Sequence, residues 1–231
     1  MRVPHLMIRA IVTDIEGTTT SIAFVHDVLF PYARARIADF VLAHADDADV
    51  ATQLAAVAHI EGRDLSPGEA GGVLERWIDE DRKATPLKAL QGRLWAQGYA
   101  DGALKGHVYA DTPVYLRRWH AAGKRLYVYS SGSVEAQKLI FGCSSAGDLT
   151  PLFSGYFDTR VGAKREAGSY QRIVAAIGLP VAQILFLSDV GAELDAARTA
   201  GLHTCQLLRD ATTKPAPGHR QARDFSQVHL P

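Results

Sequence analysis

The apolar segment IRAIVTD at residues 8–14 ends in one acidic residue, Asp14, and a second, Glu16, follows two residues later. Gly17 and three threonines come next, which indicates a tight turn directly after a buried strand. A buried carboxylate such as that of Asp14 can attack phosphorus and form an aspartyl-phosphate. Glu16 can protonate the leaving oxygen and then activate the water that hydrolyses this intermediate. The pair therefore predicts phosphoryl transfer by one nucleophile and one proton shuttle.

Four more polar residues follow apolar segments or lie in a polar loop, namely Ser130, Ser131, Lys164 and Asp189. Each alone has an ordinary explanation, as a turn serine, a solvated lysine or a helix-capping aspartate. Together they supply what phosphoryl transfer requires. Lys164 and the Ser130 hydroxyl can bind phosphoryl oxygens, and Asp189 adds a second carboxylate suited to Mg²⁺.

Repeated helix and strand patterns predict the scaffold for these residues. Consecutive apolar positions, typical of strands buried on both faces of a parallel sheet, occur at residues 8–14, 124–133, 183–189 and 202–208. Helical patterns that each end at a glycine occupy residues 111–123, 169–178 and 191–201. The alternation predicts an α/β fold, a Rossmann-like doubly wound parallel sheet, whose strand ends gather the polar residues at one edge.

A long alanine-rich interval, residues 22–104, separates the first two strand patterns and contains no convincing strand. Four helical patterns fall within it, at residues 31–45, 51–60, 71–82 and 85–99, with a loop expected over 61–72. We therefore expect a core of residues 1–21 and 105–231 and an inserted helical cap of residues 22–104. Natural hinges lie near residues 20–21 and 105–106.

The composition restricts the function further. The chain has 231 residues, 25 basic and 25 acidic residues, and a sequence pI near 7.1, which argues against nucleic-acid or polybasic membrane binding. Neither a signal-peptide pattern nor an apolar run of membrane-spanning length is evident, and the two cysteines form no CxxC. We expect a cytoplasmic protein, a monomer, acting on a small molecule.

The order of an Asp-x-acid-Gly-Thr motif, a strand-end serine, a lysine and a strand-end aspartate resembles the haloacid dehalogenase (HAD-like) superfamily of phosphohydrolases. The usual superfamily motif has Asp at the position of Glu16. That departure, together with DIEGTTTSIAFVHDVLFPYA, LKALQGRLW, YVYSSGSVEAQKLIFG, FDTRVGAK and ILFLSDV, is similar to the enolase-phosphatase (acireductone synthase) family of methionine salvage. The similarity runs over nearly the whole chain.

The resemblance implies one Mg²⁺ per chain, held by Asp14, by Glu16 through its carbonyl, its side chain or both, and by Asp189. It implies that Ser130 and Ser131 bind substrate and that Lys164 is the lysine of the third motif. Glu193 and Asp195 follow the last motif, either as exposed first-turn acids or as support for the metal.

The implied reaction is the enolisation and dephosphorylation of 2,3-diketo-5-methylthiopentyl 1-phosphate to the acireductone. Enolisation needs a base beside a carbonyl, and Glu16, one methylene longer than Asp, is the candidate. Phe24, Trp95 and Tyr99 are candidates for reading the methylthio tail, although aromatic residues at helical spacing are more often core. His26 is more simply explained as a solvated loop residue.

Three other functions remain open from the sequence. A general small-molecule phosphomonoesterase of the superfamily would keep every motif and lose only the enolisation. A 2-haloacid dehalogenase would use Asp14 without a metal and needs neither Glu16 nor Asp189. A phosphoacceptor signalling domain also combines an aspartate, a hydroxyl and a lysine, but the long insertion and the late Asp189 count against it.

Overall fold

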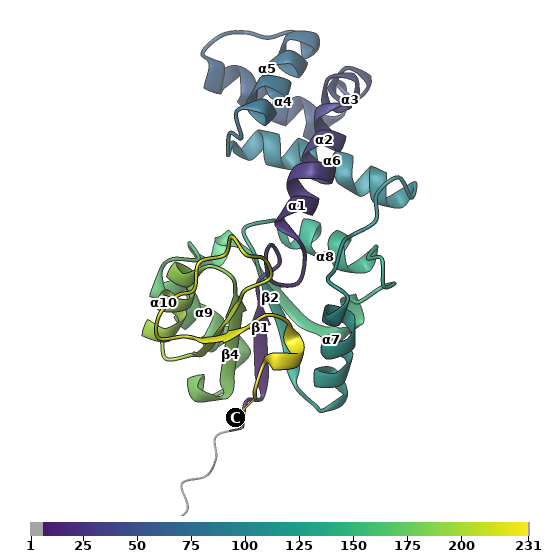
Figure 1. The fold of residues 1–231 in the computed structure, drawn as a ribbon. Helices are drawn as coiled ribbons and strands as arrows, with labels where there is room; N and C mark the ends of the chain where they lie inside the picture. Colours follow the sequence, from purple (N-terminus) through teal and green to yellow (C-terminus); the bar gives the residue numbers. More distant parts are fainter. Residues whose placement is uncertain (1–6, 231) are drawn as a thin grey trace, which may run out of the picture. The chain divides into compact units, whose positions relative to one another are not determined.

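The computed structural model describes residues 7–230, and Figure 1 shows how their helices and strands are arranged. Within these residues six parallel strands form one sheet in the order β3-β2-β1-β4-β5-β6. The strands are β1 (Ala10–Thr13), β2 (Arg125–Tyr129), β3 (Phe153–Phe157), β4 (Ile184–Ser188), β5 (His203–Leu207) and β6 (Arg220–Ala222). The strand order reverses at β1, so the predicted doubly wound α/β sheet is confirmed.

Helices cover both faces of the sheet (Figure 1). They are α7 (Asp111–Ala121), α8 (Val134–Gly142), α9 (Ala167–Ile177) and α10 (Gly191–Thr199). On one face, Tyr170 and Ile173 of α9 and Leu194 of α10 pack against Val12 of β1 and Phe186 of β4. Strands buried in this way read as continuous apolar runs, which is why the sequence revealed them.

Two strands escaped the sequence prediction, which placed only four. β3 and β6 are the edge strands, and most of their residues are partly or fully exposed. β3 carries Ser154 and Gly155, and β6 is only three residues long, so neither has the apolar run of a central strand. The second predicted strand was also too long, because β2 ends at Tyr129 and Ser133 caps α8 by accepting from the Ala136 amide at 3.2 Å.

The predicted glycine stops are present. Gly123, Gly178 and Gly201 follow α7, α9 and α10 and have φ of 74°, 67° and 94°. This left-handed region is the one that glycine adopts without the steric cost that other residues meet.

The chain divides into two compact units, one of residues 1–22 and 106–231 and one of residues 23–105. The helices between residues 22 and 105 are α1 (Ile22–Phe24), a π-helical turn η1 (Val25–Leu29), α2 (Phe30–Arg34), α3 (Ile37–Ala43), α4 (Ala48–Glu61), α5 (Pro67–Asp79) and α6 (Thr85–Ala100). Trp77, Leu74 and Leu90 lie at the centre of the second unit's own core.

One helix prediction and one loop prediction in this unit were wrong. The single helix expected over residues 31–45 is broken between α2 and α3, and α3 packs so closely on α5 that a Cβ at Gly71 would lie 3.0 Å from Ala38 Cα. The loop expected over residues 61–72 ends early, because Ser66 and Glu69 form a capping box that starts α5 at Pro67.

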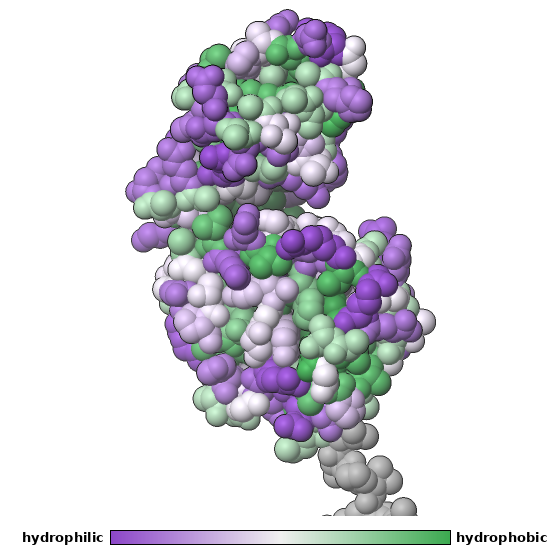
Figure 2. Space-filling view, turned by 180° about the vertical axis from the view of Figure 1, so that it is seen from behind, coloured by the Kyte–Doolittle hydropathy of each residue, from purple (hydrophilic) through white to green (hydrophobic). Residues whose placement is uncertain are grey.

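The surface mixes polar and apolar residues. Figure 2 shows hydrophilic and hydrophobic residues side by side on the face that it draws. Across residues 7–230, none of the helices combines the length and the apolar character that crossing a membrane would require.

Candidate active site

The site is built around Asp14, the residue that directly follows β1. Its backbone amide donates to the Leu187 carbonyl of β4 at 2.9 Å, and its Oδ1 accepts from the Ile15 amide at 2.8 Å. These bonds fix the carboxylate, which is only 3% exposed, at the carboxyl end of the sheet where the strand order reverses. Ligands bind at this position in open α/β sheets.

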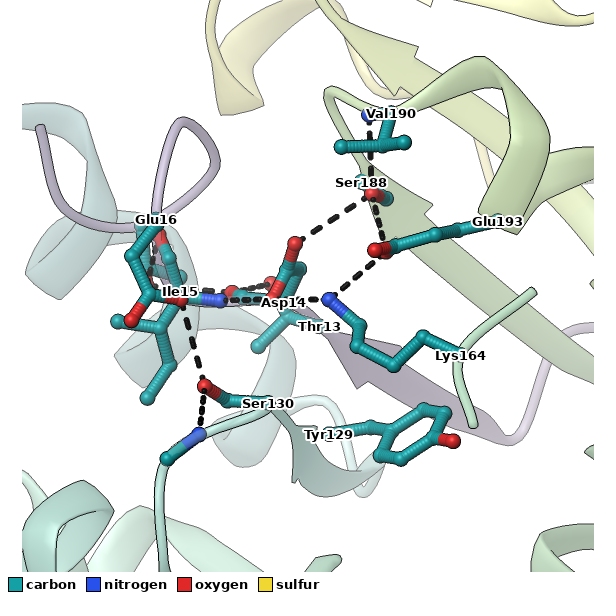
Figure 3. Close-up of polar contacts among 12 residues, drawn as sticks. Thr13, Asp14, Ile15, Glu16, Tyr129, Ser130, Lys164, Ser188, Val190 and Glu193 are labelled. Carbon is teal, nitrogen blue, oxygen red and sulfur yellow. Dashed lines mark hydrogen bonds and ion pairs between the residues drawn. The ribbon is translucent and has the colours of Figure 1, made fainter. Parts of the chain in front are cut away.

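Lys164 reaches Asp14 from the loop before α9, as Figure 3 shows. Its Nζ lies 2.7 Å from Asp14 Oδ1 and 2.7 Å from Glu193 Oε2. The hydroxyl of Tyr170 donates to the Lys164 carbonyl at 2.7 Å and so fixes the backbone of the loop. Burial alone would lower the pKa of Lys164, but the charges of Asp14 and Glu193 raise it, so the ammonium form is maintained.

Glu193 belongs to this cluster, which the sequence left undecided. It is 8% exposed, and its Oε2 also accepts from Ser188 Oγ at 3.0 Å. Burial and then the charge of Asp14 raise its pKa to about 7, although the neighbouring Lys164 ammonium acts against this shift. Asp195 differs, since it is exposed and pairs with Arg198 and His219.

Ser130 and Glu16 approach Asp14 from the other side. Ser130 Oγ donates to Glu16 Oε2 at 3.3 Å and accepts from the Gly132 amide at 3.1 Å. Burial and the nearby Asp14 charge raise the pKa of Glu16, which favours a proton on this carboxylate. Ser131 is exposed in the same loop.

The Ser130 loop has a support that sequence reasoning missed. Gln137 Nε2 donates to the carbonyls of Gly132 and Phe157, each at 2.8 Å. A single glutamine on a helix carries no sequence signal for this contact, as is also true of Tyr170.

Asp189 directly follows β4, and within residues 7–230 one oxygen of its carboxylate is left without a hydrogen bond. Its Oδ1 is buried and has no hydrogen-bond partner among the described residues. Burial and then the Asp14 charge raise its pKa to about 7. Gly17 (φ 70°) passes so close that a Cβ there would lie 2.5 Å from Asp189 Cγ.

These observations test whether a divalent cation fits. Three further carboxylates, those of Glu16, Asp189 and Glu193, surround the Asp14–Lys164 pair, so the site is rich in negative charge. An unpaired buried carboxylate oxygen beside a second carboxylate suits a hard cation such as Mg²⁺. Within residues 7–230, however, no three side chains of the His, Cys, Asp and Glu types converge as a metal cluster. The Glu16 side chain contacts Ser130, and its backbone carbonyl is a further oxygen that could hold a cation together with carboxylates of the site.

Comparison with known proteins identifies the family. Residues 8–201 match the family model of the haloacid dehalogenase-like hydrolases. The chain belongs to this family. It is also 60% identical over 224 residues to enolase-phosphatase E1 of Pseudomonas aeruginosa strain UCBPP-PA14, covering 96% of this chain and 99% of the relative. Enolase-phosphatase E1 of Azotobacter vinelandii is 58% identical over 228 residues, covering 96% of this chain and 97% of the relative.

Solved structures share the fold of this haloacid dehalogenase-like hydrolase. The crystal structure of the UTR4 protein from Saccharomyces cerevisiae is 33% identical, covers 96% of this chain and all of that chain, and superposes with a TM-score of 0.81. CbbY from Rhodobacter sphaeroides in complex with phosphate, 15% identical, shares the fold with a TM-score of 0.63 over 96% of each chain. At these identities the enolase-phosphatases are the subgroup of hydrolases to which the chain belongs, so it is an enzyme of the phosphatase type.

Proposed function

We propose that this enzyme converts 2,3-diketo-5-methylthiopentyl 1-phosphate to the acireductone of methionine salvage by enolisation followed by dephosphorylation. The enolase-phosphatase relatives support this substrate. One structural observation supports the chemistry above all others, which is the buried Asp14 carboxylate held 2.7 Å from Lys164 Nζ at the carboxyl end of β1.

Asp14 is the nucleophile of the proposed dephosphorylation. Its Oδ2, whose only hydrogen bond among the described residues is the 3.4 Å one from Ser188 Oγ, attacks phosphorus, and the bond from phosphorus to the substrate oxygen breaks, which leaves an aspartyl-phosphate and the enol. Lys164 and the Ser130 and Ser131 hydroxyls bind the phosphoryl oxygens and stabilise their charge. Lys164 also holds Asp14 in place, through the contact that the structure shows.

Glu16 is the proposed proton carrier. In its protonated form, which its raised pKa favours, it gives a proton to the departing oxygen, and as a carboxylate it then takes a proton from the water that attacks the aspartyl-phosphate. We also assign to the Glu16 carboxylate the earlier removal of the proton from the carbon beside the carbonyl, which forms the enol and leaves on Glu16 the proton that it then gives to the departing oxygen.

Asp14, the Glu16 carbonyl and Asp189 are the proposed ligands of one Mg²⁺. The bound ion would neutralise negative charge on the phosphoryl group and on the Asp14 carboxylate. This charge compensation explains why Asp189 can remain buried without a protein partner for Oδ1.

We also propose different roles for the two units. Residues 1–21 and 105–231 would be the phosphatase core, and residues 22–104 the cap that reads the methylthio tail. Of the three aromatic candidates, Trp95 is half-buried whereas Phe24 and Tyr99 are buried, so its side chain is the most accessible to a ligand. Its Nε1 donates to the Leu29 carbonyl at 2.9 Å, which fixes the ring in the unit.

The first experiment follows phosphate release and the ultraviolet absorbance of the enol together, on the diketo phosphate and on simple phosphomonoesters, with Mg²⁺ and with EDTA. We expect an absorbing enol followed by Mg²⁺-dependent phosphate release, selective for the diketone. Equal turnover of simple esters without an enol would instead assign a general phosphatase.

Two substitutions test the roles proposed for Asp14 and Glu16. Asp14→Asn is expected to abolish phosphate release, whereas Asp195→Asn is the matched control, because its carboxylate pairs with Arg198 rather than Lys164. Glu16→Gln is expected to stop both phosphate release and proton exchange at the substrate carbon. Continued proton exchange in Glu16→Gln would assign enolisation to another base.

A further inference from the structure

Arg209, two residues beyond β5, is a buried charge that the proposed chemistry does not use. Its side chain is 3% exposed, and its Nη1 lies 2.8 Å from Asp111 Oδ1 at the start of α7. The guanidinium carbon lies 4.4 Å from the ring centroid of Tyr109 and 4.8 Å from that of Phe225, so the group is in contact with two aromatic rings.

A further hydrogen bond joins Arg209 to the loop of residues 15–20, which carries Glu16. Its Nε donates to the Thr18 carbonyl at 2.8 Å across 191 residues of sequence. Thr18 lies two residues after Glu16 and directly after Gly17, which passes against Asp189. A shift of the Thr18 carbonyl would therefore move both the proton carrier and the backbone against which Asp189 lies.

Hydrogen bonds within the loop of residues 15–20 close it, and hydrogen bonds from other segments of the chain hold it in place. The amides of residues 18, 19 and 20 all donate to the Ile15 carbonyl, at 3.1, 2.9 and 2.9 Å. The outward carbonyl of Thr19 accepts from the Tyr109 amide at 3.0 Å and from Thr112 Oγ1 at 3.2 Å. Arg209 supplies the corresponding bond to Thr18, so distant segments of the chain fix the placement of the loop.

Stability alone is a weak reason for this arrangement. Burying a guanidinium group is costly even with a carboxylate partner, and an apolar side chain in its place is often as stable. Arg209 Nη2 is also buried without a hydrogen-bond partner among the described residues, which adds to the cost. What an apolar side chain could not provide is the directed bond to Thr18.

We propose that Arg209 is a positioning residue for the proposed reaction, holding the loop of residues 15–20 so that Glu16 and Asp189 have their reactive placement. The inference rests on the proposed function of Asp14 and Glu16. The guanidinium group donates to the Thr18 carbonyl through Nε and to Asp111 through Nη1 in a fixed planar geometry, whereas a lysine would have to serve both acceptors from a single nitrogen.

The test compares Arg209→Lys with Arg198→Lys in steady-state phosphate release from the diketo phosphate. Arg198 is a matched control, because it also donates to one carbonyl, Gly218 at 3.1 Å, and to one aspartate, Asp195 at 2.6 Å, but contacts no part of the site. For Arg209→Lys we expect kcat to fall about 10- to 100-fold, since a displacement of about 1 Å costs up to 10²-fold. KM should change less than about threefold, because Arg209 touches no substrate group in this proposal. Arg198→Lys should match the wild type.

A second readout separates positioning from general loss of structure. Amide hydrogen exchange over residues 15–20 is expected to be faster in Arg209→Lys, while β1 (Ala10–Thr13) keeps its protection. If Arg209→Lys does not fold, Asp111→Asn takes its place, since it weakens the hold on Nη1 and leaves the arginine present. It should lower kcat in the same direction with KM unchanged.

The outcomes are distinct. Wild-type kcat and wild-type loop exchange in Arg209→Lys would overturn the inference and leave the proposed function intact. A large rise in KM at unchanged kcat would also overturn it, because that result indicates substrate binding. A wild-type enzyme that releases no phosphate from the diketone would instead refute the proposed function itself.

Discussion

Replacing Gly17 by alanine isolates how much the placement of Asp189 contributes to activity. The new Cβ would lie 2.5 Å from Asp189 Cγ, whereas carbon atoms in ordinary contact are about 3.5 Å apart or more. The loop or the carboxylate must therefore move by about 1 Å, a displacement that can cost about 10²-fold in rate. We expect kcat/KM of Gly17→Ala to fall by about that factor, equivalent to about 2.7 kcal/mol of transition-state stabilisation.

The backbone strain of the substitution has a matched control in the same unit. Gly178 at the end of α9 has φ 67°, against 70° for Gly17, and a Cβ there would meet no atom within 4 Å. Gly17→Ala has both this backbone strain and the overlap with Asp189, whereas Gly178→Ala has the strain alone and should lose about 1 kcal/mol of unfolding free energy, because an alanine is disfavoured in the left-handed region. For a chain of this size that corresponds to a fall in Tm of about 2–4 °C.

The assay measures Mg²⁺-dependent phosphate release and thermal unfolding for both variants. Loss of activity in Gly17→Ala with full activity in Gly178→Ala, both assayed well below their Tm, would agree with the reasoning. Full activity in Gly17→Ala would refute it, because the collision with Asp189 would then have no effect on the reaction. Equal loss of activity in both would mean that destabilisation, not the collision, is responsible.

Three further predictions concern separate features. Lys164→Met should abolish phosphate release and, in metal-free protein, lower the unfolding free energy by about 3 kcal/mol, because it leaves buried carboxylates unpaired. Denaturant unfolding should show a larger loss at pH 8 than at pH 6, because fewer of these carboxylates are protonated at pH 8. Hydrogen bonds from Ser66 lower the pKa of Glu69 from 4.5 to about 2, so its contribution to stability is present above pH 4.5 and is lost as the pH falls towards 2; Glu69→Gln should make the acid-induced loss of stability shallower. Ser133→Ala removes the cap of α8 and should cost about 1 kcal/mol in denaturant unfolding, whereas Ser145→Ala, at a serine that is also exposed, should cost close to nothing.

The sequence alone determined the central strands, the helices that follow them and the class of chemistry. Strands buried on both faces must be continuously apolar, and Gly178 must follow a helix that ends in the left-handed region, so both leave a local record. The spacing of Asp14 and Glu16 after such a strand predicted phosphoryl transfer, and the comparisons confirm a hydrolase of the phosphatase type.

Only the tertiary structure decided which residues support this chemistry. Edge strands such as β3 lack a continuous apolar pattern because one side of them faces solvent. Glu193 was one of two acids after the last motif, and only folding shows that it shares Lys164 with Asp14 while Asp195 remains exposed. Arg209 lies 191 residues from Thr18, and no local pattern encodes a hydrogen bond between them. Local patterns record the burial and backbone conformation of a segment, whereas contacts between distant side chains exist only after the sheet has brought the ends of its strands together.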